Sequence, residues 1–148
     1  MNSYPIWWDS TITLYNKYID PLTQETTWTR TVIGGCFWKN DSNNITVGDT
    51  VISASSTICR IPEQDNFLIR YDWCNKPSDQ RGNYFTLGRG DIIIKGEVDD
   101  EIDERTKGHR ATDLLNKYKD MLEYLEIEEF TIDTGAGRCN PHYYVRGK

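Results

Sequence analysis

The chain has 148 residues, enough for one domain with a hydrophobic core and too few for two domains of ordinary size. Hydrophobic residues make up 37% of it and include nine Tyr and five Trp, so a few large rings must supply much of the buried area. The formal net charge of -6 argues against wrapping nucleic acid, because that needs clustered Lys and Arg.

No apolar stretch approaches the roughly 20 residues that span a bilayer, and residues 1–9 lack the basic and apolar regions of a signal peptide. We therefore expect a soluble protein that is made in the cytoplasm and has no membrane partner. The cysteines are irregularly spaced and match no metal-ligand pattern, so we expect free thiols and no bound metal; they are Cys36, Cys59, Cys74 and Cys139.

The first predicted element is a β-hairpin. Residues 11–19 alternate apolar and polar side chains, and a turn at Asp20-Pro21 follows. The second strand covers 27–38, where the adjacent Gly34 and Gly35 predict a bulge or a sharp bend. Such a bend lets one strand serve two sheets.

Residues 39–44 are polar and Asn-rich, and they are predicted to form an exposed loop. A strand over 46–61 follows and ends at Pro62; its candidate core residues are Val47, Val51, Ile52, Ile58 and Ile61. The connection over 63–83 is long for a compact domain, which is typical of a functional or a disordered segment. We expect it either to contact a partner or to form a poorly ordered surface excursion.

The segment 84–97 predicts a tight turn and a short strand. Gly88 and Gly90 allow the positive φ angles of a turn, and the β-branched Ile92–Ile94 extends after it. An acidic run over 97–104 could bind a hard cation. It lacks the residue order of a calcium loop, however, and is interpreted as a solvated surface.

Residues 111–125 carry apolar side chains at helical spacing and predict the one substantial helix. Its apolar stripe is expected to cover a sheet edge or an open barrel end, with docking of a neighbouring subunit as the alternative. Strands over 130–134 and 143–145 follow. The predicted fold is therefore mainly β: one domain, 1–148, forming an antiparallel β-barrel or sandwich with one inserted α-helix and one long loop.

Candidate catalytic and cofactor motifs are weak. Cys139 and His142 are the residue types of a cysteine nucleophile, but a turn followed by a strand would place them poorly for proton transfer. The segment 135–138 lacks the Lys-Ser/Thr pair and the following helix of a phosphate-binding loop, so we expect no cofactor. Trp7 and Trp8 form either a plug over a barrel end or an anchor in another protein.

Four segments of the chain carry a family resemblance: Thr13–Tyr18, Trp28–Trp38, Tyr84–Glu97 and Pro141–Lys148. In this order they resemble the small neck proteins of tailed bacteriophages, often labelled minor capsid, head-completion or head-closure proteins. The resemblance implies a β-barrel subunit that is not an enzyme. Such subunits assemble as a ring beneath the portal, join the DNA-filled head to the tail and retain or gate the DNA.

The resemblance also implies a location in the virion neck and a set of partners. These are a homo-oligomeric ring, portal or adaptor proteins on the head side, and tail-terminator or tail-tube proteins on the tail side. Double-stranded DNA would pass through the lumen without sequence-specific binding. The expected assembly contacts are Trp7, Trp8, Phe67, Tyr71, Asp72, Trp73, Arg89, Tyr143 and Tyr144.

The 63–83 loop is expected to project into the channel or toward the adjacent ring. Three alternatives remain open at this point: a tail-terminator or tail-completion ring, a small-ligand-binding barrel with an aromatic pocket, and a thiol hydrolase that uses Cys139.

Overall fold

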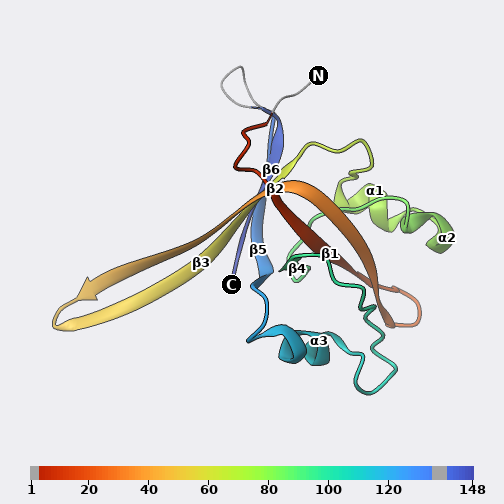
Figure 1. The fold of residues 1–148 in the computed structure, drawn as a ribbon. Coiled ribbons are helices and arrows are strands. Elements are labelled where there is room, and N and C mark those ends of the chain that lie inside the picture. The colour runs from red at the N-terminus through yellow and green to blue at the C-terminus, as the bar shows by residue number, and fades with distance from the viewer. Residues whose placement is uncertain (1–3, 135–139) are drawn as a thin grey trace.

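A computed structural model describes residues 4–134 and 140–148, without the side chains of 41–46 and 51–55. Six strands close into an antiparallel barrel in the order β1-β2-β3-β6-β5-β4 (Figure 1). The strands are β1 (Ser10–Ile19), β2 (Thr26–Val47), β3 (Thr50–Pro62), β4 (Ile92–Lys95), β5 (Tyr124–Asp133) and β6 (His142–Gly147). The helices are short: α1 (Arg70–Cys74), α2 (Ser78–Arg81) and α3 (Ala111–Tyr118). The mainly β prediction is confirmed, and the closed sheet is a barrel.

Strand β2 bends at its paired glycines and pairs with different partners on the two sides of the bend. Its first part runs antiparallel to β1 as far as the pair Ser10↔Cys36, and its second part pairs with β3 from Phe37 onward. The register with β1 shifts at the glycines, and Gly35 has a φ of 71°. The predicted hairpin and its bend are both confirmed.

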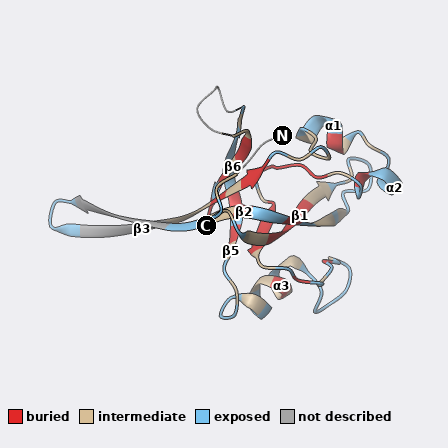
Figure 2. Ribbon diagram, turned by 45° about the horizontal axis from the view of Figure 1, so that its top comes forward, coloured by how far each residue is buried: buried red, intermediate tan, exposed pale blue. Residues whose placement is uncertain are grey.

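The barrel interior is filled with apolar side chains that alternate with outward-facing ones. Leu14 on β1 and its partner Ile93 on β4 are 0% exposed and belong to the interior core. The full set of buried residues in this core is Ile12, Leu14, Ile33, Cys36, Cys59, Ile61, Phe85, Leu87, Ile93, Leu125, Ile127, Tyr143 and Val145. Figure 2 shows the buried residues gathered in the barrel.

A second, smaller core lies on the outer face of the barrel, under α3. Tyr15 and Ile94 point outward from β1 and β4, and Leu114 of α3 packs against them. The apolar stripe of the helix therefore covers a sheet face, where the sequence had suggested a sheet edge or an open barrel end.

Helix α3 begins at the predicted residue but ends at Tyr118, short of the expected 111–125. Residues from Tyr124 onward belong to β5 instead, because Leu125 and Ile127 alternate into the barrel core. Leu125 pairs with Ile93 of β4, and Ile127 pairs with Gly147 of β6. The period-2 requirement of the sheet overrides the helical spacing there. As a result Met121, expected on the apolar stripe, is 71% exposed.

The predicted loop over 39–44 is wrong, since these residues continue β2 in register with β3. A two-stranded ladder is built from backbone hydrogen bonds and needs no buried face, so the run of Asn does not end it. Of the candidate core residues in β3, Ile61 is buried and Ile58 is half-buried, whereas Val47 is 60% exposed. The side chains of Val51 and Ile52 lie outside the described residues.

The Gly147→Ala variant should be destabilised by about 3 kcal/mol, because overpacking a closed site costs this order of free energy. A Cβ at Gly147 would lie 2.0 Å from the backbone carbonyl oxygen of Glu126, which cannot move without breaking the β5–β6 pairing. The matched control is Gly82→Ala, where no atom lies within 4 Å of the added Cβ. Urea unfolding of both variants measures the difference, and equal stabilities would contradict the account.

Candidate functional site

The most prominent surface feature is a two-stranded ribbon that leaves the barrel, which we call the arm (residues 40–57). The pairing of β2 with β1 ends at Cys36, and the pairing of β3 with β6 begins at Thr57. Within the described register, the arm strands therefore pair with each other and with no third strand. At about 3.4 Å per residue the arm extends roughly 25 Å from the barrel. Figure 1 shows it projecting to the left, away from α1 and α2.

The arm exposes its strand edges, because within the described register its two strands pair only with each other. An isolated two-stranded hairpin is marginally stable in water, and its unpaired edges offer hydrogen bonds to another chain. At its base, Asn40 Nδ2 donates to the Glu123 carboxylate, and Thr57 Oγ1 donates to Asn40 Oδ1 at 3.0 Å. The base is thus fixed to the barrel while the rest is available for contact with another molecule.

A buried polar network, which we call the Asp91 network, holds the segment after β3 against β1. The Asp91 carboxylate is 0% exposed. Its Oδ2 accepts hydrogen bonds from Arg70 Nη2 at 2.5 Å and Asn16 Nδ2 at 2.9 Å, and its Oδ1 accepts one from the backbone N–H of Lys17 at 2.9 Å. Asn16 also exchanges two hydrogen bonds with the backbone of Thr86. The carboxylate and Asn16 together join three segments of the chain: β1, α1 and residues 86–91.

The interior of the protein disfavours the charged form of the Asp91 carboxylate. Burial raises the pKa of Asp91, and the Arg70 guanidinium, the Lys17 N–H and the Asn16 amide oppose that rise. A buried carboxylate that keeps its hydrogen-bond donors holds the surrounding backbone in one arrangement. None of these residues was among the expected site residues, because their positions in the sequence are far apart.

Gly88 has a structural role different from the predicted one. Gly90 has a φ of 88° and supplies the predicted tight turn, in which the Asp91 N–H donates to the Gly88 carbonyl at 3.2 Å. A Cβ on Gly88 would lie 2.0 Å from Arg70 Nη2. Gly88 therefore provides the space through which Arg70 reaches Asp91.

Several of the expected assembly contacts are unavailable to a partner. Trp73 is 0% exposed and Tyr143 is 4% exposed, and Phe67 is half-buried and stacks on Tyr143 at 4.3 Å between ring centroids. Trp73 and Tyr143 therefore present almost no surface to a partner in this structure, and the role of the remaining expected residues as assembly contacts stays a prediction. The expected contacts Tyr71, Asp72 and Arg89 are exposed, and Tyr144 is half-buried.

The 63–83 segment packs against the barrel and does not project from it. It contains α1 and α2 and forms a parallel bridge between Phe67 and Phe85. The guanidinium of Arg81 lies 3.7 Å from the ring centroid of Tyr18 on β1. The expectation of a poorly ordered excursion is wrong, because aromatic and charged anchors fix this segment. Its orientation toward a channel or an adjacent ring stays a prediction.

The N-terminal tryptophans have separate environments. Trp8 packs at 6.2 Å from Phe37 and 5.4 Å from His142, measured between ring centroids, and covers the barrel there. Trp7 is 65% exposed. The plug interpretation thus suits Trp8, and Trp7 is free to contact another molecule.

The side chains needed for a thiol hydrolase are engaged or lie outside the described residues. His142 is 3% exposed, with Nδ1 2.9 Å from the Asn140 carbonyl oxygen and Nε2 2.8 Å from Arg60 Nη1. Cys139 lies outside the described residues. Cys59 is a buried free thiol, and its hydrogen bond with Cys36, together with burial, raises the pKa of Cys59 well above its usual value. A raised pKa disfavours the nucleophilic thiolate.

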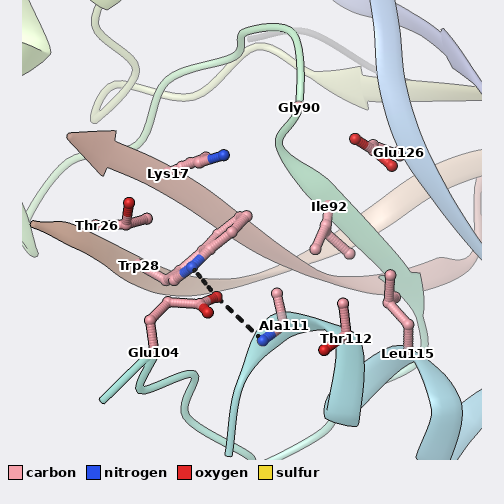
Figure 3. A pocket seen from close by; sticks show the side chains of 10 residues that line it. All are labelled: Lys17, Thr26, Trp28, Gly90, Ile92, Glu104, Ala111, Thr112, Leu115 and Glu126. Carbon is pink, nitrogen blue, oxygen red and sulfur yellow. Dashed lines mark hydrogen bonds between the residues drawn. The ribbon is translucent and has the colours of Figure 1, made fainter.

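An open pocket lies between α3 and the outer face of the barrel (Figure 3). It has a volume of about 410 Å³ and is lined by Lys17, Thr26, Trp28, Gly90, Ile92, Glu104, Ala111, Thr112, Leu115 and Glu126. Glu104 accepts hydrogen bonds from Trp28 Nε1 at 3.0 Å and the Ala111 N–H at 3.1 Å. This carboxylate therefore ties the start of α3 to β2, a role that its position in an acidic run did not predict.

The rest of the acidic run is partly structural. Asp100 accepts hydrogen bonds from Lys117 Nζ at 2.8 Å and Tyr118 Oη at 2.9 Å, and Asp103 accepts the Arg105 N–H at 3.0 Å. In the described part of the chain, no group of three or more His, Cys, Asp or Glu side chains could hold a metal ion. No described helix is long and apolar enough to cross a membrane.

Comparison with protein families gives one match: the model described as "Family of unknown function (DUF6751)" matches residues 7–148. Comparisons with curated proteins and with solved structures give no match.

The Arg70→Gln variant should lose about 3 kcal/mol of stability at pH 7, because removing one partner leaves a buried charge uncompensated. Without Arg70 the pKa of Asp91 rises further above 3.8. The folded variant then binds a proton more tightly than the unfolded chain, so its deficit should shrink as the pH falls toward 4.5.

Urea unfolding at both pH values measures the effect, with Arg89→Gln as the matched control. Arg89 is exposed, and its Nε donates a hydrogen bond to the Glu128 carbonyl oxygen at 2.9 Å. A deficit for Arg70→Gln that is independent of pH would show that Asp91 does not carry the cost.

Proposed function

We propose that this chain, which belongs to the family of unknown function DUF6751, is a structural subunit of a tailed-phage virion neck. In this proposal identical subunits form a ring between the portal or adaptor proteins of the DNA-filled head and the tail. The ring helps to retain or gate the packaged DNA. The four sequence segments that resemble phage neck proteins supply the class of particle, and the geometry of the chain supplies the argument for assembly.

The arm is the observation that carries this proposal. A closed barrel leaves no unpaired strand edges, yet this chain extends β2 and β3 well beyond the barrel. Such a ribbon becomes ordered when it lies on another surface. A contact is heterologous when the arm of one subunit binds a different surface on the next subunit. Heterologous contacts close into a ring when the rotation between neighbouring subunits returns the last subunit to the first.

The charge of the chain is compatible with DNA in the lumen. A net charge of -6 per subunit is multiplied around a ring. Acidic walls repel phosphates, so double-stranded DNA can pass without adhering and without sequence-specific contacts.

The alternatives have less support. A tail-terminator ring would use the same arm and differs in which particle it binds. In a ligand-binding barrel the interior would need free space, whereas the described interior is occupied by packed side chains such as Leu14, Phe85 and Tyr143. A hydrolase would need an imidazole free to accept a proton, and both ring nitrogens of His142 lie near other polar groups.

The first test is the mass of the purified chain by multi-angle light scattering, alone and after mixing with DNA-filled, tailless heads of the phage that encodes it. A neck subunit should bind these heads stably. Binding to isolated tails but not to heads would favour the tail terminator, and binding to neither would overturn the neck proposal.

A variant in which residues 41–56 are replaced by Asn-Gly should fold but fail to assemble. Asn40 and Thr57 are directly paired, so a two-residue turn can join them without changing the barrel. Circular dichroism and the melting temperature check the fold, and light scattering checks assembly. Leu22→Ser, which changes the 92% exposed tip of the other hairpin, is the control that should assemble. Rings formed without the arm would contradict the proposal.

A further inference from the structure

An apolar groove lies on the side of the barrel that carries α1. It has a volume of about 560 Å³ and lies among the end of β1, α1, the turn before β4, and β5. We call it the groove; its lining residues are Lys17, Tyr18, Ile19, Arg70, Cys74, Leu87, Gly88, Arg89 and Phe130. Ile19 is 51% exposed and Phe130 is 37% exposed, so its walls present uncovered apolar surface.

The groove also carries one unpaired positive charge in a chain that is acidic overall. Arg70 is neutralised by Asp91 beneath the groove. Arg89 has no ion-pair partner among the described residues and donates to a backbone carbonyl. The Lys17 ammonium lies by Trp28 in the pocket under α3 and does not add to this charge (Figure 3). An occupant that is apolar and carries a carboxylate would complement this surface.

The tip of the arm combines an exposed apolar side chain with a carboxylate, as such an occupant would. Val47 is 60% exposed, and Gly48 and Asp49 after it are also exposed. Asp49 has no ion-pair partner in the part of the chain that the structure describes. The sequence on both sides is rich in β-branched apolar residues, Ile45, Val51 and Ile52.

The arm and the groove cannot meet within one subunit. Figures 1 and 2 both show the arm on the opposite side of the barrel from α1, which lines the groove. The barrel itself is closed, so its strands offer no continuous free edge for a neighbouring arm to extend. The groove offers a second copy apolar surface and one unpaired positive charge, which suit the side chains of the arm tip.

We propose that the arm tip of one subunit binds in the groove of the next copy of the chain. Val47 contacts the apolar wall formed by Ile19 and Phe130, and Asp49 pairs with Arg89. The contact is head-to-tail and repeats around the ring. This inference rests on the proposed ring function and specifies the surfaces through which the ring forms.

The native Cys74 in the groove permits a direct test by disulfide trapping. Val47→Cys places a thiol at the arm tip, and mild oxidation should link it to Cys74 of the neighbouring subunit. The expected result is a ladder of multimers on a non-reducing gel, both for the protein in solution and for the protein bound to heads. The ladder should disappear in the Val47→Cys, Cys74→Ser double variant.

The control Lys107→Cys places a thiol on another exposed loop and should give no ladder that depends on Cys74. A Val47→Cys ladder that survives the Cys74→Ser change would overturn the proposed contact.

A charge exchange provides a second test without oxidation. Asp49→Arg and Arg89→Asp should each weaken self-association about three- to tenfold, because each places like charges together. The double variant should recover most of the wild-type affinity, as measured by sedimentation. Rings that form equally well in both single variants would overturn the groove contact and leave the ring proposal standing. Failure of the wild-type chain to self-associate in solution or on heads would overturn both.

Discussion

The hydrogen-bonded carboxylate of Asp91 is the contact through which distant parts of the chain become one surface. It joins β1, α1 and the turn before β4, and Gly88 leaves the space that Arg70 needs to reach it. Such a charge is stable in the interior only with a full set of donors. The same network fixes the position of Arg70, which lines the groove above it.

Closure of the barrel and extension of the arm are two consequences of the bend in β2. At Gly34-Gly35 the strand leaves β1 and continues with β3, which lets the sheet close. The same strand then runs past the barrel and creates the unpaired edges that closure elsewhere removes. A chain built in this way buries its core in the barrel and presents a narrow ribbon to other molecules.

Acidic residues have different roles along the chain. Glu104 and Asp100 hold the α3 region to the outer face of the barrel, while Glu97 and Asp99 remain exposed. The groove differs from this pattern because Arg89 is exposed there and has no ion-pair partner within the described chain. In the proposed contact, this local positive charge would attract an acidic arm tip and be repelled by other basic surfaces.

The sequence by itself determined the β class, the first hairpin, the bend at Gly34-Gly35 and the strand at Ile92, because alternation, β-branching and glycine act over a few neighbouring residues. Only the tertiary structure decided that 39–44 is strand, that α3 stops at Tyr118 and that Trp73 is core, since each depends on a partner far along the chain. The groove and the Asp91 network could not be predicted for the same reason. Their residues are separated by tens of positions, and they meet only when the barrel closes.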